Sequence, residues 1–342
     1  MHRRRLRHLL TLVTALAGLG LALWAGVPLP FLFGPMGACL AAALLGAPLL
    51  GVGPITQGAR TILGVAIGAS VTPALIGQLP AMALSLTLVP LHVGLIGLVG
   101  VPFFRRACGF DTVTAFFAAM PGGATDMVLF GQDAGADVRT LSLVHATRVA
   151  AIVTVAPILL SQLYGTALDS PLGASAADLP PSQMALMAAA AVVGWRAGER
   201  VGLFGASVLG PMILTLGLSL LGVIHVRPPR EALQAAQFLI GLGIGVHYVG
   251  VTLRELQRTV GLSVLFIAIL AILTGAMAEA VVLLGLAPPV EAFLAFAPGG
   301  QAEMTVLALV AGADLGYVVP HHIARVLLVI GGAPLVLRWL RH

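Results

Sequence analysis

One segment of this chain occurs twice. Pro121–Val149 returns as Pro298–Val326, 177 residues later, and the two stretches align without a gap. PGGATDM in the first stretch corresponds to PGGQAEM in the second, GADV to GADL, and HATRV to HIARV. An internal repeat inside an apolar chain is typical of membrane proteins built from two copies of one unit. The sequence therefore predicts a two-fold internal repeat, and the polar residues of each copy are the candidates for function.

The composition indicates a protein that lies in a lipid bilayer. Apolar residues make up 59% of the chain and charged residues 9%, whereas soluble domains carry roughly one-quarter charged residues. The formal net charge of +5 comes from arginines that stand singly or in short clusters between apolar runs. Such arginines are typical of topology anchors rather than of a nucleic-acid-binding face. The two cysteines form neither a disulfide framework nor a CxxC metal motif, and we expect no direct nucleic-acid partner and no cofactor.

The N-terminal sequence allows two interpretations. MHRRRLRH is followed by apolar residues to about Gly26, which is the pattern of a secretory signal. In the second copy, however, the matching place holds another apolar segment, Met184–Trp195. We therefore expect the first helix to be retained in the membrane.

Ten apolar segments are long enough to be membrane spans, five in each copy. The copies cover residues 1–165 and 183–342, and the linker 166–182 is rich in Pro, Ala, Ser and Asp. The segments are 9–26, 31–50, 61–76, 81–104 and 140–164, and then 183–195, 203–224, 238–251, 261–286 and 318–337. Small-residue spacing at Gly64, Gly68, Gly241 and Gly245 predicts helices that pack closely.

One further segment in each copy is interrupted by a Pro-Gly-Gly sequence. The segments are 111–133, broken at Pro121, Gly122 and Gly123, and 291–310, broken at Pro298, Gly299 and Gly300. Proline and glycine disfavour a continuous helix at these points. Each arm of about ten residues reaches roughly halfway through a 30 Å hydrocarbon core. Both a re-entrant hairpin and a broken helix that crosses the membrane fit this pattern.

The positions of the arginines favour the re-entrant hairpin. If the hairpins re-enter, each copy has five spans and the second copy is inverted; if they cross, the two copies are parallel six-helix bundles. With a cytoplasmic N-terminus, inversion puts six arginines of the second copy inside and two outside, and the parallel arrangement does the reverse. The six are Arg196, Arg200, Arg254, Arg258, Arg338 and Arg341, and the two are Arg227 and Arg230. Because short cytoplasmic loops collect Lys and Arg, we predict an all-α polytopic protein of the bacterial inner membrane with an inverted repeat.

Each broken segment carries one carboxylate just after the break. Asp126 and Glu303 stand at the start of the second arm, near the expected middle of the membrane. They could simply cap the half-helix, or they could couple ions to transport, because ionisable groups at this depth are costly and usually functional. Asp137 and Asp314, which each begin the next helix, are better explained as N-caps.

The helix that follows each break carries a histidine and an arginine three residues apart. These are His145 with Arg148, and His322 with Arg325. An arginine at mid-depth needs a carboxylate, a backbone carbonyl or an anionic ligand. One hypothesis is a structural ion pair of Asp126 with Arg148 and of Glu303 with Arg325. The other is that these six residues bind substrate or couple ions, with the histidines relaying protons.

The paired motifs resemble those of the bacterial AbrB-duplication membrane protein family. The resemblance rests on PGGATDM, GADV and HATRV in the first copy and on PGGQAEM, GADL and HHIARV in the second. It covers nearly the whole chain. Members of that family have been described as ammonia monooxygenases, as regulators of gene expression and as transporters, so the resemblance implies kinship more than one activity.

We predict secondary transport of a small solute, coupled to protons or sodium, by alternating access. The two arginines make a carboxylate-bearing solute plausible. The alternative is a membrane-embedded sensor that affects gene expression indirectly through a partner protein. A metal-dependent monooxygenase is the weakest of the three hypotheses, because the sequence supplies no dense set of redox-metal ligands, and we do not expect an enzyme.

Overall fold

The computed structural model describes residues 2–27, 29–70, 73–122, 124–168, 173–203 and 205–340. Every regular element in these ranges is helical. The chain divides into two compact units, and each unit takes helices from both halves of the sequence, so the units cut across the sequence copies 1–165 and 183–342. Unit 1 comprises Met1–Ile76, Ala167–Val251 and Leu309–Gly312, and unit 2 comprises Gly77–Thr166, Thr252–Ala308 and Ala313–His342.

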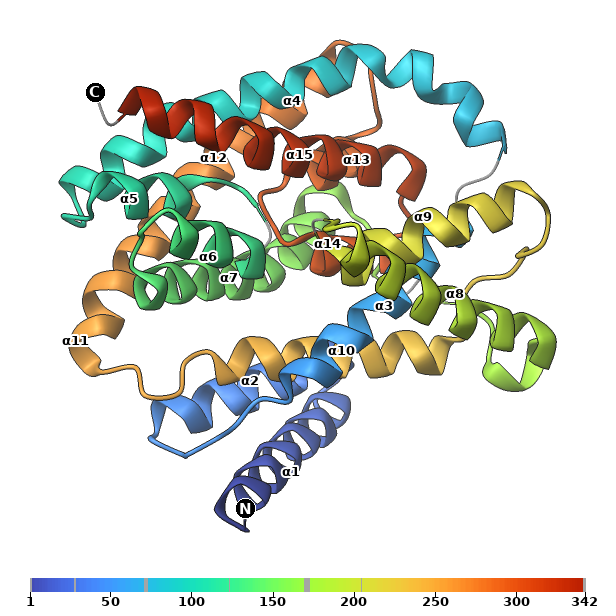
Figure 1. Ribbon diagram of the computed structural model, residues 1–342, viewed down its shortest axis with the longest axis horizontal. Helices are drawn as coiled ribbons and strands as arrows, with labels where there is room; N and C mark the ends of the chain where they lie inside the picture. The colour runs from blue at the N-terminus through green and yellow to red at the C-terminus, as the bar shows by residue number, and fades with distance from the viewer. Residues whose placement is uncertain are drawn as a thin grey trace. The chain divides into compact units, whose positions relative to one another are not determined.

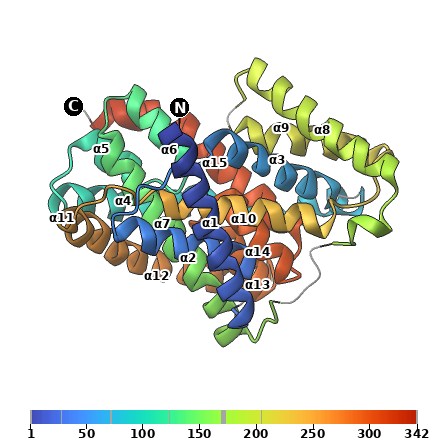
Figure 2. The ribbon, with the colours of Figure 1, turned by 90° about the horizontal axis from the view of Figure 1, so that it is seen from below.

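Unit 1 is built from three helices of each sequence copy. They are α1 (His2–Trp24), α2 (Pro30–Leu44), α3 (Gly53–Ser70), α8 (Pro181–Arg200), α9 (Ala206–Leu220) and α10 (Arg230–Val246). Figures 1 and 2 show α3 beside α8 and α9, and the contacts place α2 against α10. The described part of the predicted linker contains only the short 3-10 helix η1 (Ala176–Asp178).

Glycines allow the helices of the two copies to touch backbone to backbone in unit 1. A Cβ atom added to Gly64 would stand 2.3 Å from the carbonyl oxygen of Val208, so nothing larger than hydrogen fits there. The same close approach occurs at four positions: Gly64 with Val208, Gly68 with Met212, Gly241 with Leu32 and Gly245 with Met36. Small residues at helix interfaces let backbones approach in this way. The predicted close packing at these glycines is therefore confirmed, and it joins one copy to the other.

Unit 2 holds the long helices and the broken segments. Its elements are α4 (Pro73–Arg106), α5 (Thr112–Ala119), α6 (Ala124–Asp133), α7 (Val138–Tyr164), α11 (Leu253–Glu255), the π-helical turn η2 (Leu256–Val260), α12 (Gly261–Leu283), α13 (Pro289–Phe296), α14 (Gln301–Val310) and α15 (Leu315–Leu340). The short helices α5 and α6 lie beside α7, as Figure 1 shows. Both Pro-Gly-Gly sequences fall between two short helices, as predicted.

One hydrogen bond joins the first helix of each broken segment to the residue before the next long helix. The hydroxyl of Thr114, in the first turn of α5, accepts a hydrogen bond of 3.0 Å from the backbone N–H of Asp137, just before α7. In the second copy, the carboxylate of Glu291, in the first turn of α13, accepts a 3.3 Å hydrogen bond from the N–H of Asp314. The start of each broken segment therefore lies beside the start of the long helix that follows it.

The predicted N-caps of the following helices are confirmed. Oδ1 of Asp137 accepts hydrogen bonds from the backbone N–H groups of Arg139 at 3.0 Å and of Thr140 at 3.2 Å. Oδ1 of Asp314 accepts one from the N–H of Gly316 at 2.7 Å. These carboxylates satisfy backbone donors that have no partner within the helix.

The end of helix α4 lies against the start of helix α12. Phe104, near the end of α4, packs its ring against Phe266, near the start of α12, with the ring centroids 4.7 Å apart. Just beyond α4, the carbonyl of Cys108 accepts a 3.0 Å hydrogen bond from Nη2 of Arg258, which precedes α12. The end of α4 therefore meets the start of α12.

The remaining long helices of unit 2, α7 and α15, contact α11 and α4 through side chains. Arg139, at the start of α7, donates two hydrogen bonds of 2.7 and 3.0 Å to the carboxylate of Glu255, which ends α11. These bonds lower the pKa of the Glu255 carboxyl to about 2. Nε2 of His321, in the second turn of α15, lies 2.9 Å from Oγ of Ser85 in α4. Helices α7 and α12 thus start beside each other, and α15 contacts α4.

Several helices have the length and composition of membrane spans. Within the described residues, four are long and apolar enough to cross a bilayer: Arg4–Trp24, Met82–Arg106, Val138–Tyr164 and Gln257–Leu283. Shorter apolar helices are Pro30–Leu44, Ala206–Leu220 and Leu315–Val329. The chain is therefore an all-helical protein of membrane type, and the number of ten spans stays a prediction.

We predict that Gly64→Ala destabilises unit 1. The added methyl group would overlap the carbonyl oxygen of Val208, so α3 and α9 must separate, and overpacking of this kind costs about 1–3 kcal/mol. The measurement is the thermal unfolding midpoint of the purified protein in detergent. Gly217→Ala is the control, because a Cβ atom at Gly217 in α9 meets nothing within 4 Å. Equal midpoints for the two variants would contradict the packing described above.

Candidate functional site

The spacing of glycine and methionine that both broken segments share has a packing explanation. The side chain of Met127 lies over Gly122, where an added Cβ atom would stand within 2.7 Å of the methionine atoms. Met304 covers Gly299 in the same way, within 2.9 Å. The glycine and the methionine five residues later therefore belong together, because the thioether fills the space that a side chain at the glycine would occupy.

Two arginines bind the backbone at the breaks. Nη1 of Arg148 donates a 2.7 Å hydrogen bond to the carbonyl of Met120, and Nη2 donates one of the same length to the carbonyl of Gly122. Arg148 lies on α7 and only 1% of it is exposed. Its planar, forked guanidinium group reaches both acceptors at once.

The second copy repeats this arrangement bond for bond. Nη1 of Arg325 donates to the carbonyl of Ala297, and Nη2 donates a 2.8 Å hydrogen bond to the carbonyl of Gly299. Both acceptors lie 177 residues after those of Arg148. Carbonyls at a helix end lack an intrahelical donor, so each arginine supplies donors that the interrupted helix cannot.

These contacts change the interpretation of the arginines. The expected partner of Arg325 was Glu303, but among the described residues neither Arg148 nor Arg325 has a carboxylate oxygen within 4.0 Å. The Glu303–Arg325 ion pair is therefore wrong, and the backbone carbonyls take its place. The side chain of Asp126 and the whole of Gly123 lie outside the described residues. Within the described part of the chain, Nε of each arginine is buried without a hydrogen-bond acceptor.

The two histidines also face the broken segments. Nε2 of His322 donates a 2.8 Å hydrogen bond to the carbonyl of Leu294 in α13. His145 is fully buried, and the carbonyl of Phe117, which matches Leu294, faces its ring. The geometry at His145 falls short of a hydrogen bond. Each histidine thus lies against the first helix of its broken segment, one helical turn from the arginine.

The charged groups of the two copies come together in unit 2. Glu303, 7% exposed, turns its carboxylate back over Gly300, so a side chain at Gly300 would collide with it. The charge of Glu303 acts on Arg148 of the other copy, and Arg148 and Arg325 lie close enough to repel each other. The structure therefore gathers one carboxylate and two guanidinium groups from helices far apart in the sequence.

A polar cluster that sequence reasoning missed lies beside the second break. Nε2 of His92 donates a 3.1 Å hydrogen bond to the carbonyl of Phe296, and His321 bonds to Tyr317 and Ser85. Both histidines are buried. Neither has a counterpart in the other copy, where Ile269 matches His92 and Val144 matches His321. The difference between the two copies at these positions was the sequence signal that could have revealed the cluster.

The described residues contain no group of three or more His, Cys, Asp or Glu side chains that could hold a metal ion. His321 and His322 are adjacent in sequence but bind different partners, the former Tyr317 and Ser85 and the latter Leu294. The polar groups described at the breaks are thus two arginines, two histidines, backbone carbonyls and one carboxylate.

Comparison with known proteins identifies the relatives of this chain. A family model described as "Transition state regulatory protein AbrB" matches residues 31–341. The chain belongs to the AbrB family. The family match includes both Pro-Gly-Gly breaks and both arginines, and it confirms the kinship expected from the motifs.

Two relatives align with most of this chain. The chain is 25% identical over 321 residues to "Putative regulator AbrB" of Escherichia coli (strain K12), covering 92% of this chain and 90% of that protein. It is 24% identical over 311 residues to "Uncharacterized protein YhjN" of Bacillus subtilis (strain 168), covering 83% and 78%. No solved structure matches this chain.

We predict that Arg148→Lys destabilises the first broken segment. A single ammonium group cannot bridge the carbonyls of Met120 and Gly122, and one buried acceptor left unpaired costs about 1–3 kcal/mol. The expected result is a lower unfolding midpoint and faster amide hydrogen exchange around residues 120–124.

The same substitution at Arg139 is the control. That side chain is 66% exposed in its pair with Glu255, and exposed pairs contribute about 0–1 kcal/mol. Equal losses at positions 148 and 139 would argue against a structural role for the carbonyl contacts.

Proposed function

We propose that this protein is a secondary transporter of a small carboxylate-bearing solute. The observation that carries the proposal is the pair of buried guanidinium groups at two helix breaks, with no described carboxylate in contact. Buried charges without a partner are costly in a membrane and mark substrate or ion pathways. Each guanidinium group already uses two of its donors on carbonyls and keeps its buried Nε–H free of any described acceptor.

An inverted repeat with two re-entrant hairpins is the architecture that we propose for this transporter. The contact between the end of α4 and the start of α12 supports inversion, because the two helices occupy matching places in the two copies. The contact of Arg258 with Cys108 supports it too, since inversion alone puts Arg258 on the side of Arg105 and Arg106. The hydrogen bonds that close each broken segment on itself support hairpins that re-enter.

The proposed mechanism is alternating access around the hairpin tips. Transporters of this kind place broken helices and their exposed backbone at the binding site, and one body of the protein moves against another. The division of the chain into two compact units offers two such bodies. The hairpins with their arginines belong to unit 2, so we assign solute binding to unit 2.

Coupling to protons or sodium is assigned to Glu303, together with Asp126. The carboxylate of Glu303 is nearly buried and acts on Arg148. A cation or proton that neutralises Glu303 would change the electrostatic potential that an anionic solute meets beside the arginines. His145 and His322 are proposed as the groups that respond to this change, because they share a helix face with the arginines.

A second candidate function is a membrane-embedded sensor with an indirect role in gene expression. The names of the family model and of the Escherichia coli relative favour it. In this proposal the same site binds a solute, and a partner protein reads the state of the membrane domain. We propose the bacterial inner membrane as the location, with the N-terminus in the cytoplasm, and neither an enzymatic role nor a direct nucleic-acid partner.

The first test is a ligand screen on the purified protein. A carboxylate that binds the folded state raises its stability, by about 2.7 kcal/mol when present at one hundred times its dissociation constant. We expect at least one small carboxylate to raise the unfolding midpoint and its uncharged amide analogue to leave it unchanged. If no carboxylate binds and liposomes containing folded protein take up none, the transporter proposal fails. A co-purifying regulatory protein without solute flux would favour the sensor.

The second test separates coupling from binding with Glu303→Gln. We expect this variant to keep solute binding in the thermal screen but to lose accumulation driven by a proton or sodium gradient in liposomes. Glu199→Gln, at an exposed position of α8 in unit 1, is the matched control and keeps both activities. Gradient-driven uptake at the normal rate in Glu303→Gln would remove Glu303 from the coupling mechanism.

A further inference from the structure

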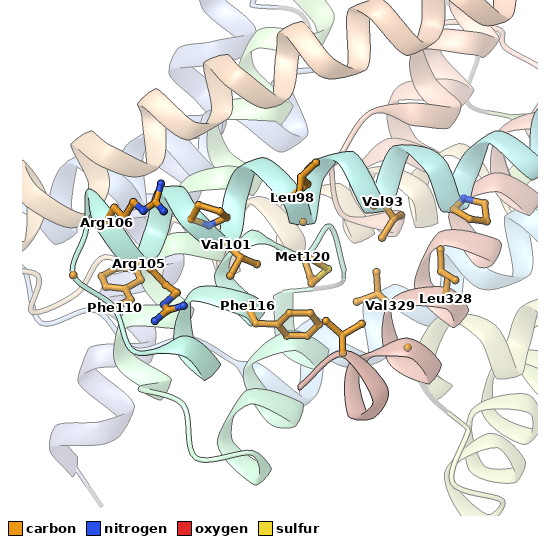
Figure 3. A pocket seen from close by; sticks show the side chains of 17 residues that line it. Val93, Leu98, Val101, Arg105, Arg106, Phe110, Phe116, Met120, Leu328 and Val329 are labelled. Carbon is orange, nitrogen blue, oxygen red and sulfur yellow. The ribbon is translucent and has the colours of Figure 1, made fainter. Parts of the chain in front are cut away.

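Unit 2 contains a long apolar pocket that the proposed transport site does not use. Its volume is about 850 Å³, and its walls come from α4, the turn after it, α5 and α15. In Figure 3, Arg105, Arg106 and Phe110 are grouped at one end, and Val93, Leu328 and Val329 lie toward the other. The pocket is thus apolar along its length and cationic at one end.

Near the cationic end, arginines outnumber the carboxylates, and the nearby carboxylates already have other partners. The guanidinium group of Arg258 binds the carbonyl of Cys108 and stands close to Gly109, which lines the pocket. Asp111, the nearest acid along the chain, caps α5 through Val113 and Thr114. Glu255 is held by Arg139. The charges of Arg105 and Arg106 therefore have no carboxylate partner within 4.0 Å among the described residues.

The pocket opens toward the surroundings of the protein. Leu98, in the middle of its α4 wall, is 73% exposed. A Cβ atom added to Gly94 on α4 or to Gly332 on α15 would meet nothing within 4 Å, so these glycines leave room beside the two helices. From Arg105 back to Pro90 the helical rise is about 22 Å. That length exceeds the half-thickness of roughly 15 Å that one acyl chain occupies in a 30 Å hydrocarbon core.

The internal repeat does not reproduce the cationic end of this pocket. The positions that match Arg105 and Arg106 in the second copy are Val282 and Leu283. There α12 packs against both α13 and α7, and the rings of Phe293 and Tyr164 lie 6.1 Å apart. The cationic end therefore lies apart from the repeated contacts of Arg148 and Arg325 with the breaks.

We propose that this pocket binds a phospholipid with an anionic head group. One acyl chain lies along the apolar walls of α4, α5 and α15, and the phosphate of the head group contacts Arg105 and Arg106. A lipid fits better than a soluble anion because the pocket is long, apolar and open to the side. Basic residues just outside a membrane-spanning helix attract anionic lipid head groups, and the aliphatic stems of arginine cover apolar surface while the charge stays outside.

The head group is tested by native mass spectrometry of the full-length protein. The probes are phosphatidylglycerol and phosphatidylethanolamine with identical acyl chains, and glycerol phosphate as a head group without chains. We expect retention of phosphatidylglycerol over the other two, and at least tenfold weaker binding in the double variant Arg105→Gln, Arg106→Gln. Arg196→Gln, Arg200→Gln is the control, since it removes the same charge from exposed positions of α8.

The acyl chain is tested with a substitution that fills the pocket. Gly94→Leu places a side chain in the open space beside α4, and we expect it to displace phosphatidylglycerol without lowering the unfolding midpoint. Gly275→Leu is the control, because this exposed glycine of α12 also has nothing within 4 Å and does not line the pocket. Equal retention of phosphatidylglycerol by all four variants, or equal binding of both lipids, overturns the proposal. Neither measurement involves solute flux, so the result is independent of the proposed transport.

Discussion

The hydrogen bonds from Arg148 and Arg325 to backbone carbonyls hold the two breaks in shape. A polypeptide that interrupts a helix inside an apolar environment leaves carbonyls without donors, and nothing in hydrocarbon can replace them. A guanidinium group offers donors in a planar fork, and in each copy two of them reach carbonyls two residues apart in the chain. The break and the arginine 27 residues after its proline therefore depend on each other, which explains why the sequence repeats them together.

The same contacts leave the positive charge of each arginine only partly satisfied. Carbonyl oxygens carry partial charges, whereas a carboxylate would neutralise the guanidinium group fully. Because Glu303 acts on Arg148 without touching it, the region retains an excess of positive potential among its described groups. The two guanidinium groups are held near each other and repel. An anionic ligand bound beside them would reduce this repulsion. The structural and the functional interpretation of the arginines therefore do not exclude each other.

Much of the fold could be predicted from the sequence, because its signals were local. The ten apolar segments correspond to ten helices, the Pro-Gly-Gly breaks separate short helices, and Asp137 and Asp314 cap helices. The sequence could not show which carbonyls bind Arg325, because a backbone carbonyl has no sequence signature, whereas Glu303 offered an opposite charge in the same copy. The exchange of helices between the copies, with Gly64 against Val208 and Gly241 against Leu32, also lay beyond sequence patterns. Glycine spacing indicates that a helix has a close neighbour but does not say which one.

Departures from the repeat carry information that the repeat itself does not. Both copies share a glycine, a methionine and an arginine, and these residues make the contacts at each break. Only the second break has His92 bound to its Phe296 carbonyl, and only the end of α4 carries Arg105 and Arg106. Two fully equivalent copies would offer the same side chains at matching positions. These unmatched residues instead give the two copies different chemistry, at the second break and at the end of α4.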